Sequence, residues 1–238
     1  MVERLPELEP FRLDDWITDV LYPVKSGKEA SVYCCRAHPR VGVELLAAKI
    51  YHPVSYRSFR DDAVYQEGRV ILDKRMCRAV RRKTRAGKGY QAGAWVDAEY
   101  ETLQLLYAQG ADVPKPYAMS GETILMEYVG DLEMSAPTLH EIRLESDEAR
   151  RVFELLIHNV ETWLSCNRVH SDLSPFNILY WNGNVKVIDF PQAVDPRFNR
   201  NAFDLLLRDV NNVSAYFAKH GIQVDSYRIA KDLWIRSG

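Results

Sequence analysis

Two aspartates and an asparagine lie close together in one short stretch of this 238-residue chain, residues 169–190. Asp172 lies in a short polar loop, residues 170–177, which Asn177 ends, and Asp189 follows the next hydrophobic run. Between them, the Asn-Gly pair at 182–183 predicts a tight hairpin turn. Because a hairpin returns the chain to its start, we expect Asp189 to come back beside Asn177 and Asp172.

These three side chains have the chemistry that phosphoryl transfer requires. The oxygen atoms of Asn177 and Asp189 suit Mg²⁺, which takes few protein ligands and keeps water or phosphate as the others. Asp172 beside such a metal can accept or orient a substrate hydroxyl, which completes a set of metal, nucleophile and base. The alternative is that Asp172 caps a turn and Asn177 satisfies loop backbone. The complete spacing at a hairpin favours the catalytic interpretation.

The first half of the chain predicts short strands and one helix. Runs rich in β-branched and aromatic residues, separated by turns, indicate an antiparallel meander. A helical repeat then places Val96, Tyr100, Leu103 and Tyr107 on one face, and Gly110 supplies the stop. The predicted strands cover residues 17–25, 30–37, 43–51, 117–120 and 123–129, and the predicted helix covers residues 94–110.

The second half predicts mostly helices. Ser146 is the expected cap of a helix whose first turn holds Asp147 and Glu148. Apolar stripes continue this helix and predict two more. Strands early and helices late indicate an α+β fold with two lobes, whose seam is near residues 126–131. The predicted helices cover residues 146–164, 203–217 and 224–236.

The composition excludes several classes of protein. The formal net charge is −2, so the chain as a whole has no excess charge that would attract nucleic acid or a membrane surface. No apolar run is long enough to span a membrane, and residues 1–10 lack the apolar core of a signal peptide. We therefore expect no membrane partner. The cysteines, Cys34, Cys35, Cys77 and Cys166, show no regular framework, which indicates reduced thiols and a cytoplasmic location.

The motif H-x-D-L-x-x-x-N, followed by I-D-F, resembles the catalytic loop and the metal-binding aspartate of the protein-kinase-like superfamily. Two positions differ from ordinary protein kinases: Ser171 replaces an Arg, and D-F-P-Q replaces the D-F-G signature at residues 189–192. With S-G-K-E-A-S-V-Y at residues 26–33, these departures resemble the RIO family of atypical kinases. That family typically has Gly at the position of Ser171. The resemblance extends from about residue 18 to residue 218.

The resemblance implies an α+β, bilobal protein-kinase-like fold. Residues 1–17 are then an N-terminal extension, and residues 18–129 an N-lobe with an antiparallel sheet and one main helix. Within this lobe, a flexible basic loop is expected at about 74–91. Residues 130–238 are a mostly helical C-lobe that contains the catalytic hairpin.

The resemblance also implies a nucleotide site in the N-lobe. Lys49 matches the strand lysine that contacts the α- and β-phosphates, and Glu99, beside the apolar face of the predicted helix, is its expected partner. Glu101 is less favoured because it falls on another face. The alternative is that Lys49 and Glu99 extend separately to solvent. Further expected contacts are Ser26, Gly27, Lys28, Glu29, Ala30 and Val32 in a phosphate turn, and Met126, Glu127 and Val129 in a hinge. A plain hairpin turn and an ordinary edge strand are the alternatives for these two segments.

One run is strongly basic. Residues 74–88 contain many Lys and Arg side chains and no acidic residue. This pattern predicts contact with RNA phosphates, for instance on a ribosomal particle, or with an acidic partner. The alternative is a solvated segment without a dedicated ligand.

The resemblance implies an ATP- and Mg²⁺-dependent serine/threonine protein kinase, with Mn²⁺ as an alternative ion. Such an enzyme transfers the γ-phosphoryl group of ATP to a hydroxyl of an as yet unidentified protein substrate, and it autophosphorylates. Some family members act mainly as ATPase switches in ribosome assembly, where the aspartate at the position of Asp189 can become an aspartyl-phosphate. Two alternatives stay open: a small-molecule phosphotransferase of the aminoglycoside or choline kind, which shares the H-x-D-x4-N loop, and an ATP-gated ribosome-assembly or RNA-binding factor.

Overall fold

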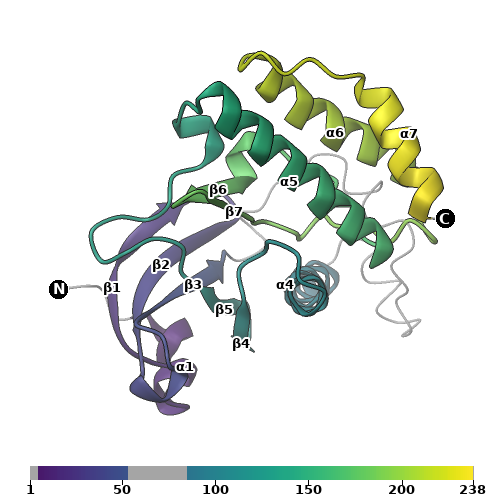
Figure 1. The fold of residues 1–238 in the computed structure, drawn as a ribbon. Coiled ribbons are helices and arrows are strands. Elements are labelled where there is room, and N and C mark those ends of the chain that lie inside the picture. Colours follow the sequence, from purple (N-terminus) through teal and green to yellow (C-terminus); the bar gives the residue numbers. More distant parts are fainter. Residues whose placement is uncertain (1–4, 53–84, 238) are drawn as a thin grey trace. The chain divides into compact units, whose positions relative to one another are not determined.

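The computed structural model describes the backbone of residues 5–52 and 85–237, and the side chains of residues 5–52 and 93–237. The described residues, drawn as a coloured ribbon in Figure 1, divide into two compact units by the contacts within each unit. Residues 5–52, 85–101 and 114–135 belong to the first unit, and residues 102–113 and 136–237 belong to the second. Each unit has a hydrophobic core of its own.

The first unit is built on a five-stranded antiparallel sheet with the order β1-β2-β3-β5-β4. All five predicted strands are present, although the third begins at Leu45 rather than at residue 43 and the fifth ends at Glu127 rather than at residue 129. The strands are β1 (Ile17–Ser26), β2 (Ala30–Ala37), β3 (Leu45–Tyr51), β4 (Pro116–Ser120) and β5 (Thr123–Glu127). The unit also contains the short helices η1 (Pro6–Leu8), α1 (Glu9–Leu13) and η2 (Pro39–Val41).

Helix α4 (Arg85–Ala108) contributes to both units. It begins earlier than the predicted residue 94, so residues 85–91, which we expected to be part of a loop, are helical. The rest of the basic run, residues 74–84, lies outside the described residues. The helix ends just before Gly110, as predicted, and this glycine has a φ of +77°, which suits a helix end.

The buried face of α4 differs from the predicted one at its last turn. Val96 and Leu103 are buried as expected, but Tyr107 is exposed and Leu106 is buried in its place. The helical period of 3.6 residues explains the difference, because steps of three and four from Leu103 lie on opposite edges of the stripe. The edge of the helix that carries Leu106 packs into the hydrophobic core of the second unit.

Strand β3, in the middle of the sheet of the first unit, is buried on both faces. On β3, Ala48 belongs to the hydrophobic cluster that includes Phe11 of helix α1. Its neighbour Ala47 belongs to the opposite cluster, together with Val96 of α4. Lys49 lies two residues beyond Ala47, so the strand period of two places it on the face that α4 covers.

The second unit combines three long helices with a β-hairpin. Helices α5 (Ser146–Ser165), α6 (Ala202–Ala218) and α7 (Ser226–Ser237) pack against one another, as Figure 1 shows, and confirm the predicted helices. The strands β6 (Ile178–Trp181) and β7 (Asn184–Val187) form the hairpin. Short 3₁₀ helices lie at Leu139–Glu141 and Pro175–Asn177. The largest fully buried side chains of this core include Trp163, Phe190 and Phe217.

The start of α5 corrects one prediction. Ser146 is the first helical residue, and the preceding Glu145 occupies the capping position without a side-chain hydrogen bond. The acidic first turn, Asp147 and Glu148, is present as expected. These carboxylates favour the helix through its dipole, so the start is stabilised by charge rather than by a serine cap.

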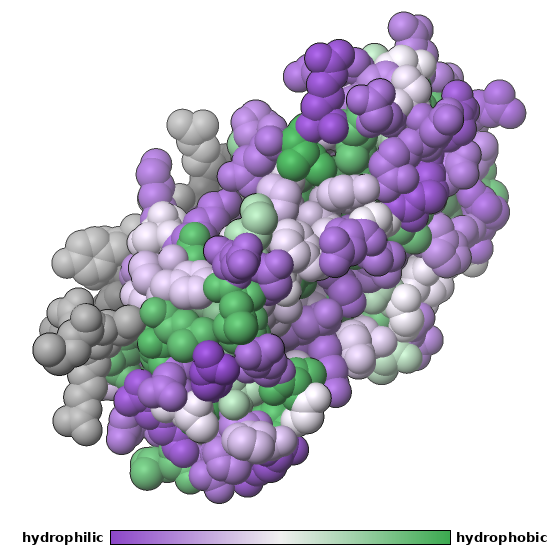
Figure 2. Space-filling view, turned by 60° about the vertical axis from the view of Figure 1, so that its left-hand side comes forward, coloured by the Kyte–Doolittle hydropathy of each residue, from purple (hydrophilic) through white to green (hydrophobic). Residues whose placement is uncertain are grey.

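Apolar side chains also reach the surface. On the face that Figure 2 shows, they form separate patches between hydrophilic residues. Among the described residues, the exposed large apolar side chains include Val43, Leu132 and Met134 in the first unit and Phe176 and Phe198 in the second. No helix in the described part of the chain is both long enough and apolar enough to cross a bilayer.

The turn of the β6–β7 hairpin requires left-handed backbone at both central residues. Asn182 has a φ of +48° and Gly183 a φ of +79°. Replacing Gly183 with Val should lower the free energy of unfolding by about 1 to 2 kcal/mol, because a β-branched residue is strained in this conformation. Urea denaturation monitored by circular dichroism measures the change. Gly183→Asn is the matched control, since Asn tolerates this backbone, and equal losses in both variants would contradict the explanation.

Candidate active site

A buried ion pair joins β3 to α4 in the first unit. The Lys49 ammonium donates to both carboxylate oxygens of Glu99, at 2.7 and 3.0 Å. Lys49 is 9% exposed and Glu99 is 1% exposed. The predicted pairing is therefore confirmed, and separate extension of the two side chains to solvent is wrong. Because burying two charges costs free energy even when they pair, stability alone does not account for this arrangement.

Tyr51 is a third member of this group that was not predicted from the sequence. Its hydroxyl donates to Oε2 of Glu99, and the centre of its ring lies 4.8 Å from Nζ of Lys49. The side chain is buried. Its position two residues after Lys49 on β3 was the available signal, since such residues share a face of the sheet. Tyr51 therefore helps to orient the carboxylate of Glu99.

The expected phosphate turn at residues 26–30 is a tight connection between β1 and β2. The backbone N–H of Gly27 donates to the carbonyl of Ala30 at 2.9 Å and closes the turn. Val32, two residues after the turn, lies directly opposite Lys49 in the register of β2 and β3. The turn is therefore close in the sheet to the buried ion pair. Ser26, Gly27 and Lys28 are exposed, whereas Glu29 and Ala30 are half-buried.

The expected hinge begins at the end of β5. Met126 is buried in the core of the first unit, whereas Glu127 and Val129 are half-buried. The backbone N–H of Glu127 donates to the carbonyl of Lys115 at 2.8 Å, and Oε2 of Glu127 accepts from the backbone N–H of Lys115 at 3.0 Å. The backbone N–H of Glu127 is therefore engaged within the protein. A contact between Glu127 and a ligand would use an atom other than this N–H.

The hairpin of the second unit brings its polar residues together as predicted. The backbone N–H of Ile188, next to Asp189, donates to the carbonyl of Asn177 at 2.9 Å. The side-chain amide of Asn177 donates to the carbonyl of Asp172, also at 2.9 Å. Asn177 thus connects residues 170–177, which we call the catalytic loop after the motif they resemble, to the segment that carries Asp189.

The oxygen atoms of this group suit a magnesium ion. The amide nitrogen of Asn177 is engaged with Asp172, which leaves Oδ1 as its metal-binding atom. Asp189 supplies a carboxylate from a backbone with a φ of +74°, a strained conformation of the kind that functional sites retain. No group of three or more His, Cys, Asp or Glu within the described ranges could hold a metal by itself. Mg²⁺ does not need one, because it keeps water or phosphate as its other ligands.

Asp172 lies in an electrostatic environment that favours its neutral form. Partial burial, followed by the nearby carboxylate of Asp189, raises the pKa of Asp172, while Arg208 opposes the rise. The residue still has an exposed surface within its unit. A raised pKa makes the ionised carboxylate a better proton acceptor. The environment therefore suits a base that receives a proton from a hydroxyl.

His170 ties the catalytic loop to the segment before Asp189. Its Nδ1 accepts from the backbone N–H of Asp172 at 3.3 Å, and its Nε2 lies 3.1 Å from the carbonyl of Ile188. Both contacts are satisfied when the ring is neutral and carries its proton on Nε2. The ring is buried, with its centre 4.5 Å from that of Phe190 and 5.9 Å from that of Trp163. His170 therefore holds two parts of the site in a fixed relation.

Asp209 of helix α6 anchors the catalytic loop, and the sequence analysis missed it. Its carboxylate accepts from the backbone N–H groups of Ser171 at 2.7 Å and Leu173 at 2.9 Å, on either side of Asp172. The neighbouring Arg208 donates to the carbonyl of Ser171. A signal was present in the sequence, because Asp209 lies on the same helical stripe as buried apolar residues three before and four after it.

The backbone of Ser171 explains one departure from the usual family sequence. Ser171 has a φ of +71°, a left-handed conformation that glycine adopts most easily. This suits the family's typical Gly at the same position. Here the Ser171 side chain is fully buried, and its hydroxyl donates to the carbonyl of Val169 at 3.2 Å. That local bond helps the loop to keep the conformation without a glycine.

Burial raises the pKa of Asp209 from an ordinary 3.8 to about 7, although the two backbone donors and Arg208 favour its ionised form. Between these two pH values the folded chain binds a proton that the unfolded chain has released. The contribution of Asp209 to stability is therefore largest below the lower value and declines as the pH rises to about 7. Asp209→Asn should remove this dependence, so the stability difference between wild type and variant should shrink over that interval.

Chemical denaturation across this pH range measures the effect. At pH 5 the variant should lose roughly 1 to 3 kcal/mol, because the asparagine offers one oxygen where Asp209 offers two, so one of the two buried N–H groups loses its acceptor. Asp204→Asn, on the exposed side of the same helix, is the matched control. A difference between wild type and Asp209→Asn that does not vary with pH would contradict the assigned pKa.

Comparison with known proteins places these observations in a family. The model of the RIO domain, RIO1, matches residues 31–230 of this chain. Serine/threonine-protein kinase RIO1 of Caenorhabditis elegans is 31% identical over 206 residues, which cover 86% of this chain and 38% of that protein. RIO-type serine/threonine-protein kinase Rio1 of Haloferax volcanii is 32% identical over 203 residues, which cover 85% of this chain and 64% of that protein. The chain thus spans less than two thirds of either relative.

Among solved structures, the Rio2 kinase of Chaetomium thermophilum in an ADP/Mg²⁺-phosphoaspartate complex is similar. The TM-score is 0.69 at 22% sequence identity, and the match covers 95% of this chain and 65% of that one. This likeness confirms the predicted α+β, kinase-like fold. The family model and the relatives confirm the resemblance that the sequence motifs suggested: the chain belongs to the RIO family of kinases.

Proposed function

We propose that this protein is an ATP- and Mg²⁺-dependent serine/threonine protein kinase of the RIO type. The observation that carries the proposal is the buried Lys49–Glu99 ion pair, which has the form that a phosphate-binding lysine requires. Its relatives are named serine/threonine-protein kinases, and the similar Rio2 structure contains ADP and Mg²⁺. Family membership also favours this function over a small-molecule phosphotransferase of the aminoglycoside or choline kind.

In this proposal the first unit binds the nucleotide. Glu99 and Tyr51 hold the ammonium of Lys49 in one position, from which it contacts the α- and β-phosphates. The turn at residues 26–30 places backbone N–H groups over the phosphates. Met126 and Val129 border the base, and Glu127 contributes an atom other than its engaged backbone N–H.

The second unit supplies the metal ligands and the base. Oδ1 of Asn177 and the carboxylate of Asp189 would hold Mg²⁺, with Mn²⁺ as an alternative ion of the same coordination chemistry. By holding the ion, these two residues would supply a positive charge that offsets the negative charge of phosphate oxygens. Asp172 orients the hydroxyl of a protein substrate and accepts its proton, which its raised pKa favours.

Asp189 is a second acceptor that the family suggests, since the similar Rio2 structure is a phosphoaspartate complex. In this route a carboxylate oxygen of Asp189 forms a bond to the γ-phosphorus of ATP, while the bond from that phosphorus to ADP breaks. Water then displaces the phosphate and restores the carboxylate. Such a cycle would serve an ATPase switch in ribosome assembly, with residues 74–88 as the contact to RNA or to a ribosomal particle.

We also propose the lobe boundaries that the sequence suggested, with residues 18–129 as the nucleotide-binding lobe and residues 130–238 as the catalytic lobe. A cytoplasmic location is part of the proposal. It is supported by Cys34, Cys35 and Cys166, which are free thiols among the described residues.

Incubation of the full chain with γ-labelled ATP and Mg²⁺ tests the catalytic assignment. Asp172→Asn and Asp189→Asn should each reduce label incorporation by at least about 100-fold, because each removes a group used in the transition state. Asp147→Asn, an exposed carboxylate of helix α5, is the matched control and should retain activity. Undiminished labelling in both catalytic variants would contradict the site.

Mapping the label by mass spectrometry then identifies the acceptor. Label on Ser or Thr that resists hydroxylamine supports transfer to a hydroxyl. Label on Asp189 that hydroxylamine removes supports the aspartyl-phosphate route.

Tyr51→Phe tests the support of the ion pair. Losing one hydrogen bond to a charged carboxylate should raise the KM for ATP by about 10-fold, while kcat changes little. Glu99→Gln should have a larger effect on kcat/KM, because Lys49 loses its charged partner. Tyr107→Phe on the exposed side of α4 is the control. An unchanged KM in Tyr51→Phe would show that the hydroxyl does not support nucleotide binding.

A further inference from the structure

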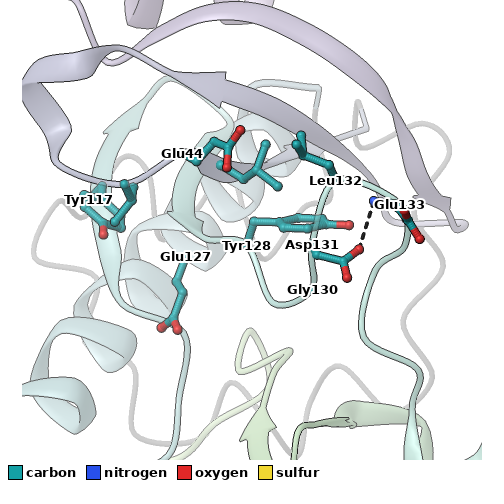
Figure 3. A pocket seen from close by; sticks show the side chains of 10 residues that line it. Glu44, Tyr117, Glu127, Tyr128, Gly130, Asp131, Leu132 and Glu133 are labelled. Carbon is teal, nitrogen blue, oxygen red and sulfur yellow. Dashed lines mark hydrogen bonds between the residues drawn. The ribbon is translucent and has the colours of Figure 1, made fainter.

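The first unit has a surface pocket beside the end of β5, which we call the acidic pocket (Figure 3). Its walls come from residues 43–45 at the start of β3, from Tyr117 of β4, and from residues 127, 128 and 130–133. The cavity has a volume of about 550 Å³, within the range of pockets that bind ligands. Tyr117 and Tyr128 present aromatic surface to it. Asp172, Asn177 and Asp189 do not line it, whereas Glu127, one of the expected hinge residues, does.

The wall formed by residues 130–135 is a rigid turn. Gly130 has a φ of +140°, and a Cβ there would lie 2.5 Å from the carbonyl oxygen of Met134. Oδ1 of Asp131 accepts from the backbone N–H groups of Glu133 and Met134, both at 2.9 Å, and Figure 3 shows the first of these bonds. The backbone of Gly130 also pairs with that of Ser135. The pocket is therefore already formed before a ligand arrives.

The charge of the acidic pocket is negative. Its lining includes four carboxylates, Glu44, Glu127, Asp131 and Glu133, and no Lys, Arg or His. Nearby bases offset this only in part. Arg36 lies 3.3 Å from Glu44 in an exposed pair, and the Lys115 ammonium stacks over the Tyr117 ring. In the described part of the chain, the Glu133 side chain makes no hydrogen bond or ion pair. The pocket therefore favours a cationic ligand.

Apolar side chains border the same pocket. Val43 is 42% exposed and Leu132 is 48% exposed, and both line the cavity. Met134, on the same turn, is 52% exposed. A free metal ion would gain nothing from this apolar rim, whereas a peptide with an aliphatic side chain would cover it. Carboxylates beside aromatic and aliphatic surface fit the guanidinium or ammonium groups of a peptide and the stems that carry them.

We propose that the acidic pocket docks a basic segment of a partner protein, in which Arg or Lys residues flank an aliphatic anchor. The anchor packs against Leu132, Val43 and the Tyr128 ring, and the cationic groups pair with Glu133, Glu44 and Asp131. The site is distinct from the residues proposed to act in phosphoryl transfer. A partner protein could therefore bind to the acidic pocket without being a substrate for phosphoryl transfer.

Fluorescence anisotropy with labelled peptides tests the proposal on the full chain. The probe RRLRR carries the anchor and the charges, RRGRR lacks the anchor, and EELEE reverses the charges. None contains a hydroxyl acceptor, so binding is measured independently of kinase activity. RRLRR should bind about tenfold more tightly than RRGRR, as expected for burial of one leucine side chain. EELEE should not bind, and added salt should weaken RRLRR.

Variants locate the binding site. Glu133→Lys and Leu132→Ser, both at exposed positions, should each weaken RRLRR by at least about fivefold. Glu154→Lys, at an exposed position on helix α5, makes the same charge change elsewhere and should bind as the wild type does. Asp172→Asn should also bind normally, which separates docking from the proposed catalysis.

Three results would overturn the proposal. The first is equal binding of RRLRR and EELEE. The second is an unchanged affinity for RRLRR in both Glu133→Lys and Leu132→Ser. The third is binding of RRLRR only after the basic residues of 74–88 are changed to Ser. The last result would identify the chain's own basic segment as the occupant instead of a partner.

Discussion

The buried carboxylate of Asp209 is the interaction on which the catalytic loop depends. It accepts hydrogen bonds from the backbone N–H groups of Ser171 and Leu173, so it holds the residues on both sides of Asp172. A buried carboxylate needs donors, and two buried N–H groups need an acceptor, so each satisfies the other. The side chain proposed to accept a proton is thus positioned through its neighbours, by a helix that comes later in the sequence.

The backbone conformations of the loop follow from this anchoring. Ser171 and Asp189 both have positive φ values, which non-glycine residues keep only when their surroundings determine them. His170 contributes on both sides, through the backbone N–H of Asp172 and the carbonyl of Ile188. Asn177 adds a second link between the same two segments. The loop and the segment of Asp189 therefore form one hydrogen-bonded group.

In the first unit, the charged Lys49 lies on β3, a strand that is buried on both faces. Strand alternation places Lys49 toward α4, and helical spacing places Glu99 on the same face as Val96. These two periodicities made the pair predictable. Tyr51 shares the face of Lys49, but a tyrosine on an apolar strand is usually core packing, so its hydroxyl contact with Glu99 was not predictable from the pattern.

The sequence by itself determined the strands, the three helices of the second unit, the hairpin and the pairing of Lys49 with Glu99, because each depends on local periodicity or on a short motif. It misplaced Tyr107 and the start of α4, where the neighbouring core decides which edge of a helix is buried and how far the helix extends. Only the tertiary structure showed the role of Asp209, the left-handed backbone of Ser171 and the acidic pocket. Each of these depends on contacts between segments distant in the sequence, and no local pattern records which buried donor will meet which acceptor.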